Sequence, residues 1–415
     1  MIKMNLRYFI LELLSFQLLI TNIVWVPNII NRILVSIYIM LGLIALLTGK
    51  LKPRITFFTK LIYIYCFFSL ISGIVGGYFS LGVVLSTTQF VFYTIIICCY
   101  NHEELTKQIL KYFKTIATIM PCSVVYSIIL LFLGKTIYKD GVYVNYINSF
   151  ILQKGYGYYG NLGYASFFSN SNIWALLLFF SILYYLYVCK SNKKFFYIAI
   201  ASIGVILADS RAIEICCIFI FILKCVEWIK QKINHKELLV FTFMGGLICL
   251  EIIISKISNI AEYIIKLDWA GRMQMWQIML QSIKQHPIFG IGFSMSTKQL
   301  LGNTMLGTTV GSHNSYLNIL TENGFMGGII FGFIILYILT IIYKIYILAL
   351  DDTDGCYRIV SMVFIIYIIY AFVENAIMIV EFRHAIWLMS CLIIEGFYLN
   401  LNKRKKVISI DQYFM

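Results

Sequence analysis

Two arginines and one histidine stand in polar motifs that could do chemistry. Arg211 lies in a short polar interruption (209–211) of an apolar stretch, and Arg272 opens a motif that ends at Trp276. An arginine fork binds phosphate oxygens through two parallel hydrogen bonds, so either residue could hold a lipid-linked phosphate. His313 precedes a helical run. Because a helix N-terminus disfavours imidazolium, we expect this histidine to be neutral and able to accept a proton.

Each motif also has a purely structural interpretation, which the sequence leaves open. The 209–211 motif could be a turn whose serine caps the next helix. Residues 272–285 could form an amphipathic helix that Arg272 anchors at the membrane surface. His313 could stand by chance at a capped helix start. The Gly290-x-Gly292 pair is a weak signal, because no strand–helix context of a dinucleotide fingerprint surrounds it.

The composition indicates the elements that must position these residues. Of the 415 residues, 60% are hydrophobic and 13% are charged, and the mean hydropathy is +0.85. A soluble fold cannot cover so much apolar side chain with polar surface. Because runs of about 20 apolar residues span a bilayer, we predict an all-α polytopic helical membrane protein, with a single integral membrane domain over residues 1–415. About twelve transmembrane helices are expected, near 8–24, 29–48, 56–78, 81–100, 115–133, 167–189, 195–208, 212–228, 238–256, 325–348, 359–380 and 384–400.

The lysines and arginines divide unequally between the two sides of this topology. With the N-terminus inside, 22 of the 33 fall in inner segments and 11 in outer segments. Cytoplasmic loops of membrane proteins carry such an excess. We therefore expect both termini to be cytoplasmic. The same bias accounts for the net charge of +14, so no nucleic-acid partner is expected. The first apolar run begins at Tyr8 and is followed by Pro27 and then directly by a second span. This arrangement argues against a cleavable signal peptide.

The apolar stretch 195–223 tests the topology. One long helix would move the lysines that follow it to the outer side, whereas two short helices joined at 209–211 keep them inside. The joining turn would then lie at the outer membrane surface, where an arginine is costly and therefore a functional candidate. Two outer segments are long: a Tyr- and Gly-rich loop over 134–166 and a large polar loop over 257–323, between spans nine and ten. Chemistry is expected on this face.

Cysteine usage and repeats exclude several other classes. None of the 11 cysteines is expected in an outer loop, and the sequence contains no Cys-x-x-Cys pair, so neither a disulfide framework nor a zinc site is indicated. We expect no metal and no cofactor. The sequence shows no internal repeat, which weakens the interpretation as an inverted-repeat transporter.

The order of the motifs resembles the O-antigen ligase/polymerase superfamily, which contains Wzy-type polysaccharide polymerases and WaaL-type ligases. The matching motifs are Ser210-Arg211, Arg272-x-x-x-Trp276, Pro287-x-x-Gly290-x-Gly292, His313-Asn314-x-x-Leu317 and Glu322-x-Gly324-x-x-Gly327. Phe168-x-Asn170-x-Asn172 is similar to the family's Asn-Pro-Asn motif, with Ser171 in place of proline. The motifs cover roughly residues 166–330, and the first 160 residues resemble the family only in hydropathy.

The resemblance implies a membrane glycosyltransferase of GT-C-like architecture in the bacterial cytoplasmic membrane. Its donor would be an undecaprenyl-diphosphate-linked oligosaccharide, and flippase and chain-length regulator proteins would be its partners beside the membrane lipids. Arg211 and Arg272 match the family's diphosphate-binding arginines, and His313 matches the proposed base. The candidate substrate-binding residues are Asn172, Asn314, Tyr316, Glu322 and Arg383. Asn172 and Arg383 also have an interpretation as interfacial caps.

Three functions remain open at this stage. The first, which we favour, is polymerisation of surface polysaccharide repeat units, such as those of O-antigen or capsule. The second is ligation of finished glycan to another acceptor, which sequence does not separate from polymerisation. A flippase for lipid-linked oligosaccharides belongs to a different class and ranks behind both, because polar residues concentrate in the outer loops rather than in the spans.

Overall fold

The structure is a computed structural model of the 415-residue chain. It describes residues 6–21, 23, 26, 28–77, 79–132, 136–139, 142–145, 166–168, 171–208, 210–232, 272–293, 300–301, 312–348, 355–378 and 382–413.

The described residues form a helical bundle with one small hairpin. In chain order the helices are α1 (Leu6–Ile20), α2 (Asn28–Leu47), α3 (Phe57–Val75), α4 (Leu81–Ile97), α5 (His102–Phe132), α7 (Ser171–Tyr187), α8 (Lys194–Ala208), α9 (Arg211–Lys232), α11 (Arg272–Gln285), α13 (Ser315–Leu348), α14 (Cys356–Tyr370) and α15 (Phe382–Tyr413). Strands β1 (Thr136–Lys139) and β2 (Val142–Asn145) pair antiparallel, with Thr136 opposite Asn145. The hairpin falls within the loop predicted over 134–166.

Five of the described helices are long and apolar enough to cross a membrane by length and composition, and shorter apolar helices accompany them. The polytopic helical architecture predicted from the sequence is therefore confirmed. Eleven of the twelve predicted spans coincide with a helix, and the twelfth, over 238–256, lies outside the described residues. The predicted break at 209–211 is also confirmed, because α8 ends at Ala208 and α9 begins at Arg211. Amphipathic helix α11 spans the predicted residues 272–285.

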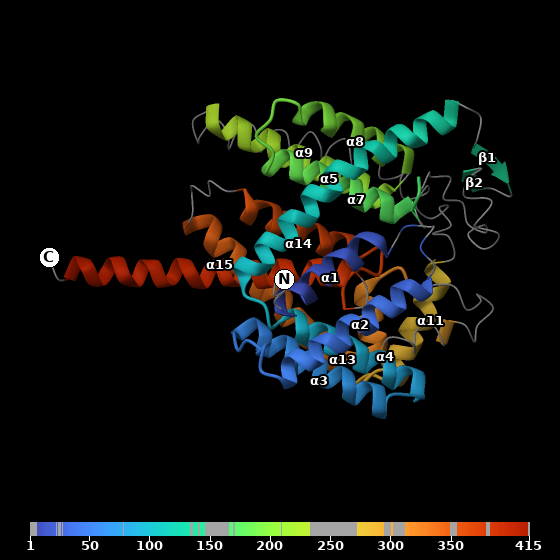
Figure 1. Cartoon of the computed structure of the whole chain (residues 1–415). Coiled ribbons are helices and arrows are strands. Elements are labelled where there is room, and N and C mark those ends of the chain that lie inside the picture. Colours follow the sequence, from blue (N-terminus) through green and yellow to red (C-terminus); the bar gives the residue numbers. More distant parts are fainter. Residues whose placement is uncertain are drawn as a thin grey trace, which may run out of the picture.

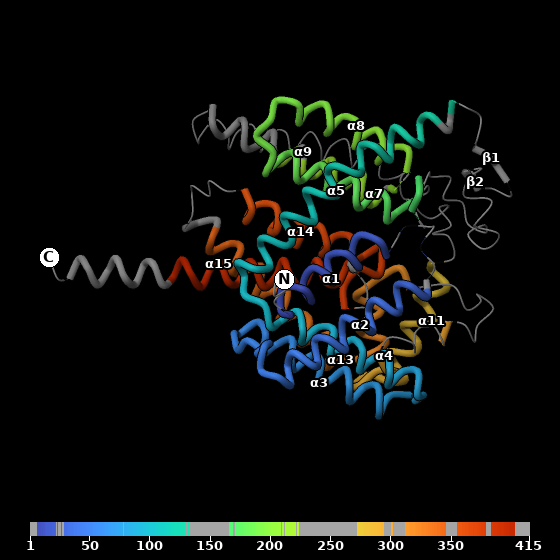
Figure 2. Tube along the Cα trace, viewed as in Figure 1, coloured from blue at the N-terminus to red at the C-terminus, as the bar shows by residue number. Residues whose placement is uncertain are grey.

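Helix α15 is the central helix of the bundle. In the apolar window of α15, 72% of the residues are buried, the largest share among the five long helices. It packs against α4, α5, α13 and α14. On one side of it lie α2, α3, α4 and α13, and on the other lie α5, α7, α8 and α9 (Figure 1). Figure 2 shows the same arrangement, with α15 between these two groups of helices and α11 at one end of the bundle.

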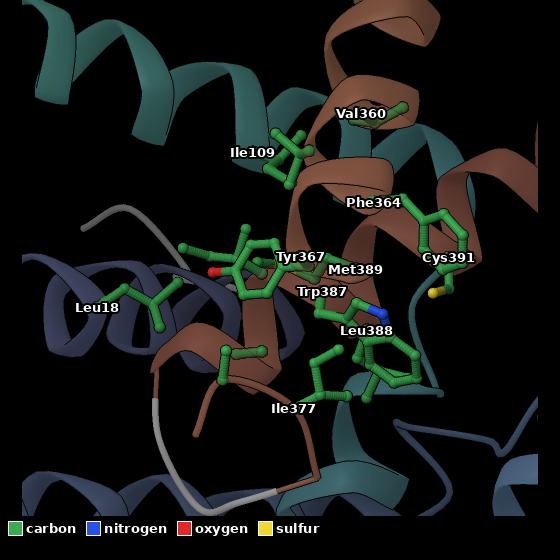
Figure 3. Packing of buried hydrophobic residues seen from close by; sticks show 14 of the residues in the cluster. Leu18, Ile109, Val360, Phe364, Tyr367, Ile377, Trp387, Leu388, Met389 and Cys391 are labelled. Carbon is green, nitrogen blue, oxygen red and sulfur yellow. The ribbon is translucent and has the colours of Figure 1, made fainter. Parts of the chain in front are cut away.

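Aromatic and aliphatic side chains fill the space between α14 and α15. Trp387 on α15 is fully buried and lies beside Phe364 of α14. Figure 3 shows these side chains together with Leu18 of α1 and Ile109 of α5, so elements from both ends of the sequence share this core. The apolar seam fixes where α15 begins and where the segment preceding it must turn.

The structure corrects three predicted boundaries. Helix α5 begins at His102 rather than near 115, because the Asn101 side chain accepts from the Glu104 N–H at 2.8 Å and Glu104 accepts from the Asn101 N–H at 3.0 Å. This reciprocal cap starts the helix within the segment predicted from the sequence to be an inner loop. Helix α13 begins at Ser315 rather than 325, so the last nine residues of the loop predicted over 257–323 are helical.

The third correction concerns the span predicted over 359–380. Helix α14 ends at Tyr370, and residues 371–378 form a turn instead of continuing the helix. The carbonyl of Ala371 accepts a hydrogen bond from the Ser315 N–H at 2.8 Å. In a longer α14, the Ala371 carbonyl would accept a hydrogen bond from within the same helix. Here it is bound by the start of α13, and the 371–378 turn packs against that start.

Helix α13 is interrupted at Gly324, and the segment 287–292 closes the interruption. The carbonyls of Thr321 and Glu322 accept from the N–H groups of Ile291 and Gly292 at 2.9 and 3.1 Å. In return, the N–H groups of Phe325 and Met326 donate to the carbonyls of Pro287 and Ile288 at 2.7 and 3.3 Å. A helix break leaves backbone N–H and C=O groups that need partners outside the helix. The reciprocal bonds supply these partners and dock the end of α11 on α13.

Gly324 and Gly290 permit that close approach. Gly324 has a φ of 62° and a ψ of −165°, a conformation that L side chains rarely adopt. A Cβ at Gly324 would lie 2.3 Å from the carbonyl oxygen of Ile288, and one at Gly290, where φ is 70°, would lie 2.5 Å from the backbone of Glu322. The Gly-x-Gly motif is therefore a backbone-packing device in this protein.

Candidate functional site

Glu374 is the centre of a charged cluster in the 371–378 turn between α14 and α15. Its Oε1 accepts a hydrogen bond from Asn172 Nδ2 at 2.9 Å, and its Oε2 lies 3.2 Å from His313 Nδ1. A terminal nitrogen of Arg272 lies 3.7 Å from Oε1, and one of Arg383 lies 4.0 Å from Oε2. Four side chains that are distant in the sequence thus converge on one carboxylate.

Helix α11 delivers Arg272 to the cluster from its first position. The guanidinium donates a hydrogen bond to the Val373 carbonyl at 3.0 Å, next to Glu374. One turn along α11, the indole N–H of Trp276 donates to the Ser312 carbonyl at 3.0 Å. The buried face of the helix carries Met275 and Met279. The amphipathic pattern therefore fixes one face against the bundle while its first turn holds both loops that carry the site.

A network of hydrogen bonds presents His313 to Glu374. Asn375 Oδ1 accepts from the Ser312 hydroxyl at 2.5 Å and from the Asn314 N–H at 3.2 Å. The Ser315 hydroxyl donates to the Glu374 carbonyl at 2.9 Å and accepts from the Ala376 N–H at 2.9 Å. His313 itself has a φ of 47°, which is uncommon for a residue with a side chain. Such a conformation persists where surrounding contacts enforce it, and it often accompanies a functional site.

Asn172 and Ser210 connect the break between α8 and α9 to the same carboxylate. The Ser210 hydroxyl donates to Asn172 Oδ1 at 2.8 Å, while the amide nitrogen of Asn172 donates to Glu374. Ser210 is buried. The residue after it, Arg211, begins α9, and its side chain lies outside the described part of the structure. The chain from Ser210 through Asn172 therefore brings the backbone that carries Arg211 to the Glu374 cluster.

The electrostatics of Glu374 keep it charged. Burial on its own would raise the pKa of this carboxyl, yet the hydrogen bond from His313 and the positive charges of Arg383 and Arg272 outweigh burial and hold the pKa of Glu374 below its ordinary value. An ionised carboxylate only accepts, so the proton in the shared hydrogen bond belongs to His313 Nδ1. In the neutral imidazole, that assignment leaves Nε2 as the nitrogen able to accept a proton. The His313 side chain is 32% exposed, so a substrate can reach it.

The predicted site residues divide into two groups. The structure brings Arg272, His313, Asn172 and Arg383 together around Glu374. Asn314, Tyr316 and Glu322 have structural contacts instead, and the side chain of Arg211 lies outside the described residues. Asn314 Oδ1 accepts from the Leu317 N–H at 3.0 Å and caps α13, and the Tyr316 hydroxyl donates to the Ile368 carbonyl at 2.8 Å.

Glu322 lies away from the cluster. It is buried in α13, seven residues after the helix begins at Ser315, which corresponds to about 10 Å of helix rise. Its backbone carbonyl accepts from the Gly292 N–H at 3.1 Å and from the Ser72 hydroxyl. These contacts place Glu322 in the packing around the helix break rather than beside His313.

Arg383, which also had an interpretation as an interfacial cap, and its neighbour His384 do not lie at the surface of the bundle. Both are buried in the first turn of α15, because that turn packs into the bundle core. His384 Nε2 lies 3.2 Å from the Thr94 hydroxyl, and its Nδ1 accepts from the Met378 N–H at 3.3 Å. This histidine therefore positions the 371–378 turn instead of facing the membrane surface.

Glu374 and Asn375 are candidate site residues that sequence reasoning missed. Both were hidden inside the predicted span 359–380, where the apolar pattern continues around them. A glutamate within a span is a functional candidate by itself, since an ionisable group there is costly. That signal could have singled out Glu374. The described residues contain no group of three or more His, Cys, Asp or Glu side chains placed to hold a metal ion.

Together, the fold and the site define a polytopic helical membrane protein with an arginine- and histidine-containing cluster at one end of its bundle. Residues 162–332 match the family model described as O-antigen ligase. This match confirms the resemblance to the O-antigen ligase/polymerase superfamily, whose members are membrane enzymes of the glycosyltransferase type. Asn172, Arg272 and His313 lie within the matched residues, whereas Glu374 and Arg383 lie after them. No curated protein matches the chain.

Proposed function

We propose that this protein polymerises repeat units of a surface polysaccharide. It would transfer an oligosaccharide from an undecaprenyl-diphosphate carrier to an acceptor sugar hydroxyl, on the outer face of the bacterial cytoplasmic membrane. The observation that carries the proposal is the convergence of Arg272, Arg383 and His313 on Glu374. Two cations and a proton acceptor in one place are what the transfer of a diphosphate-linked sugar requires.

In the proposed reaction, the acceptor hydroxyl oxygen attacks the anomeric carbon of the donor sugar and forms the new glycosidic bond. The bond from that carbon to the diphosphate oxygen breaks, and its electron pair leaves with the lipid diphosphate. The hydroxyl proton passes to Nε2 of His313, whose Nδ1–H faces the Glu374 carboxylate at 3.2 Å. The resulting imidazolium is stabilised by that carboxylate, as a buried acid stabilises the histidine of a hydrolase triad.

The arginines would neutralise the charge that develops on the leaving diphosphate. Arg272 is held by the Val373 carbonyl, so its guanidinium is oriented before substrate binds. Arg211 would add a second fork, because the link from Ser210 through Asn172 brings its backbone toward the same cluster. Arg383 would complete the cationic wall next to Glu374.

The distribution of lysines supports the outer orientation of the site. Asn172 stands at the start of α7, whereas Lys190, Lys193 and Lys194 follow its end. The 17 residues of α7 correspond to about 25 Å, close to the thickness of the bilayer core. If the lysines are cytoplasmic by the positive-inside rule, the site faces the outside, where the flippase would deliver its substrate and a chain-length regulator would meet the product.

The experiment that tests the proposal is deletion of the gene in its host, followed by glycan profiling on a gel. Loss of the polymerase leaves single-repeat glycan. Loss of a ligase would leave lipid-linked polymer, and loss of a flippase would leave neither product outside the cell. Purified protein incubated with synthetic undecaprenyl-diphosphate-linked repeat units should form a ladder of longer products. A wild-type protein that forms no ladder and a deletion strain with unchanged glycan would reject the proposal.

A further inference from the structure

Glu374 is an unexpected residue in a site proposed to bind an anion. A carboxylate next to the arginines repels a diphosphate and occupies positive charge that the substrate needs. Glu374 is nevertheless buried, with its side chain 11% exposed, and it sits between Arg272 and Arg383. A residue that opposes binding at this location must contribute to another part of the reaction.

The distances divide the contacts of Glu374 into two kinds. It accepts from Asn172 at 2.9 Å and lies 3.2 Å from His313, both within hydrogen-bond range. The nitrogens of Arg272 and Arg383 lie 3.7 and 4.0 Å away, beyond the range of the charge-assisted hydrogen bonds that arginine forms with a paired carboxylate. Glu374 is therefore hydrogen-bonded to His313 and Asn172, and it interacts with the two arginines through charge alone.

The orientation of Arg272 agrees with this division. Its first hydrogen bond goes to the Val373 carbonyl at 3.0 Å, and its ion pair with Glu374 is the longer contact. A guanidinium has five N–H donors, so these two contacts leave donors of its fork for another anion. Phosphate oxygens, which match the fork bidentately, would compete well with a carboxylate 3.7 Å away.

We propose that Glu374 is an internal counter-anion: it weakens the hold of Arg272 and Arg383 on the lipid diphosphate and keeps His313 in the tautomer that accepts the acceptor's proton. The inference rests on the proposed function, which it deepens. Glu374 acts through its neighbours, so it is a positioning residue rather than a catalytic one. It lowers affinity for the diphosphate that must leave after each transfer, and it raises the rate of the transfer step.

This role predicts opposite effects on binding and on rate. Glu374→Gln removes the negative charge while keeping the size of the side chain. The variant should bind undecaprenyl diphosphate more tightly, roughly tenfold, because a like charge facing the ligand has gone. Its transfer rate should fall about 10²-fold or more, since the imidazolium that forms during transfer loses its carboxylate. A residue with a merely structural role would lower both quantities together.

Glu395 is a second buried carboxylate, which lies on α15, and it offers a matched control for Glu374. It accepts from the Thr56 hydroxyl at 2.6 Å, the Phe58 N–H at 2.9 Å and the Tyr337 hydroxyl at 3.0 Å, and none of these groups belongs to the Glu374 cluster. Glu395→Gln reports what neutralising a buried acid does to folding and expression. It should leave the affinity for undecaprenyl diphosphate unchanged.

The experiment measures binding of undecaprenyl diphosphate and transfer from lipid-linked repeat units, with full-length purified protein in detergent. The variants are Glu374→Gln, Glu374→Asp, Glu395→Gln and Arg272→Ala. Glu374→Asp keeps the charge but draws it away from His313, so it should keep the wild-type affinity and lose rate. This variant keeps the test decisive if Glu374→Gln does not fold.

The outcomes separate the two proposals. If the wild type binds the lipid, Arg272→Ala weakens binding and Glu374→Gln strengthens it while slowing transfer, the counter-anion role holds. If the wild type binds the lipid and Arg272→Ala weakens binding, but Glu374→Gln binds the lipid no more tightly than the wild type, the counter-anion role is overturned while the proposed function stands. If the wild type does not bind undecaprenyl diphosphate and Arg272→Ala changes nothing, the proposed function itself fails.

Discussion

His313 and Glu374 are 61 positions apart in the sequence, yet Nδ1 of the imidazole lies 3.2 Å from Oε2 of the carboxylate. The contact joins the turn before α13 to the turn after α14. It sets which nitrogen of His313 carries the proton, and it leaves the other nitrogen to a substrate. A contact that fixes a tautomer is most useful to a residue that moves a proton, which is why His313 is the base of the proposed reaction.

Replacing His313 by alanine should slow transfer and spare donor binding. The histidine takes a proton from the acceptor, and loss of a general base typically costs about 10²–10⁴-fold in rate. Polymer formation from lipid-linked repeat units measures the rate, and retention of undecaprenyl diphosphate measures binding. His286→Ala is the control, because His286 lies just after α11 and, among the described residues, no hydrogen bond or ion pair joins it to the Glu374 cluster. Equal losses in both variants would remove His313 from the mechanism.

Replacing Arg272 by lysine should rescue activity poorly. Lysine keeps the charge, but it lacks the planar fork that holds the Val373 carbonyl and a phosphate at once. Removal of one such contact typically costs on the order of 10²–10³ in rate. Lys284→Ala, on the exposed face of the same helix, should have wild-type activity. Near-normal activity of Arg272→Lys would return this arginine to the role of an interfacial anchor.

The sequence predicts the helices well because their signal is local. Apolar runs of spanning length, the polar interruption at 209–211 and the period of α11 are each contained within one segment. Arg272 and His313 were predictable for a related reason: Arg272 opens the amphipathic stretch 272–285, and His313 stands among polar, turn-forming residues. The all-helical membrane fold therefore follows from composition and spacing, and Arg272 and His313 follow from their local motifs, whereas Asn172 and Arg383 were named as site residues only through the family resemblance.

The rest depends on contacts between distant segments. Glu374 lies in an apolar run that reads as part of a span, and only the Ser315 contact to Ala371 shows that the helix stops before it. The interruption of α13 at Gly324 is likewise invisible in hydropathy, because the 287–292 segment supplies the missing backbone partners. Glu322 was placed in the site by its motif, whereas its surroundings show it packed at that interruption.

Alanine at Gly324 should destabilise the protein by about 2 kcal/mol or more, because the Cβ would meet the Ile288 carbonyl and the backbone conformation is strained for any L side chain. Gly332 is the matched control on the same helix. Nothing lies within 4 Å of a Cβ placed there, so alanine should be neutral or slightly stabilising. Thermal unfolding in detergent compares the two variants. A Gly324→Ala protein as stable as Gly332→Ala would show that the close approach is not required.

The orientation of the protein can be measured by cysteine labelling. We expect a cysteine at position 284, exposed on α11, to react with an impermeant reagent added outside intact cells, and one at position 193 to react only after the membrane is opened. The reason is the excess of lysine and arginine in the predicted inner segments. Labelling must be compared with the same protein lacking the introduced cysteine. External labelling at 193 together with protection at 284 would reverse the topology and place the site in the cytoplasm.

The pH dependence of stability should report the ionisation of Glu374. Its folded-state pKa lies below the ordinary value of 4.5, so its ionised form stabilises the fold. That contribution is complete above about pH 4.5 and is lost as the pH falls below this value toward the lowered pKa. Arginine side chains in general do not titrate in this range, so the loss is expected to come from the carboxyl. Thermal unfolding midpoints at pH 7 and at decreasing pH below 4.5 should therefore fall more in the wild type than in Glu374→Gln, whose amide does not titrate. Glu395→Gln, measured in the same way, shows how much of the acid destabilisation comes from Glu395, the buried carboxyl on α15, rather than from Glu374. If the unfolding midpoint falls equally with decreasing pH in the wild type and in Glu374→Gln, Glu374 is not held ionised by its neighbours.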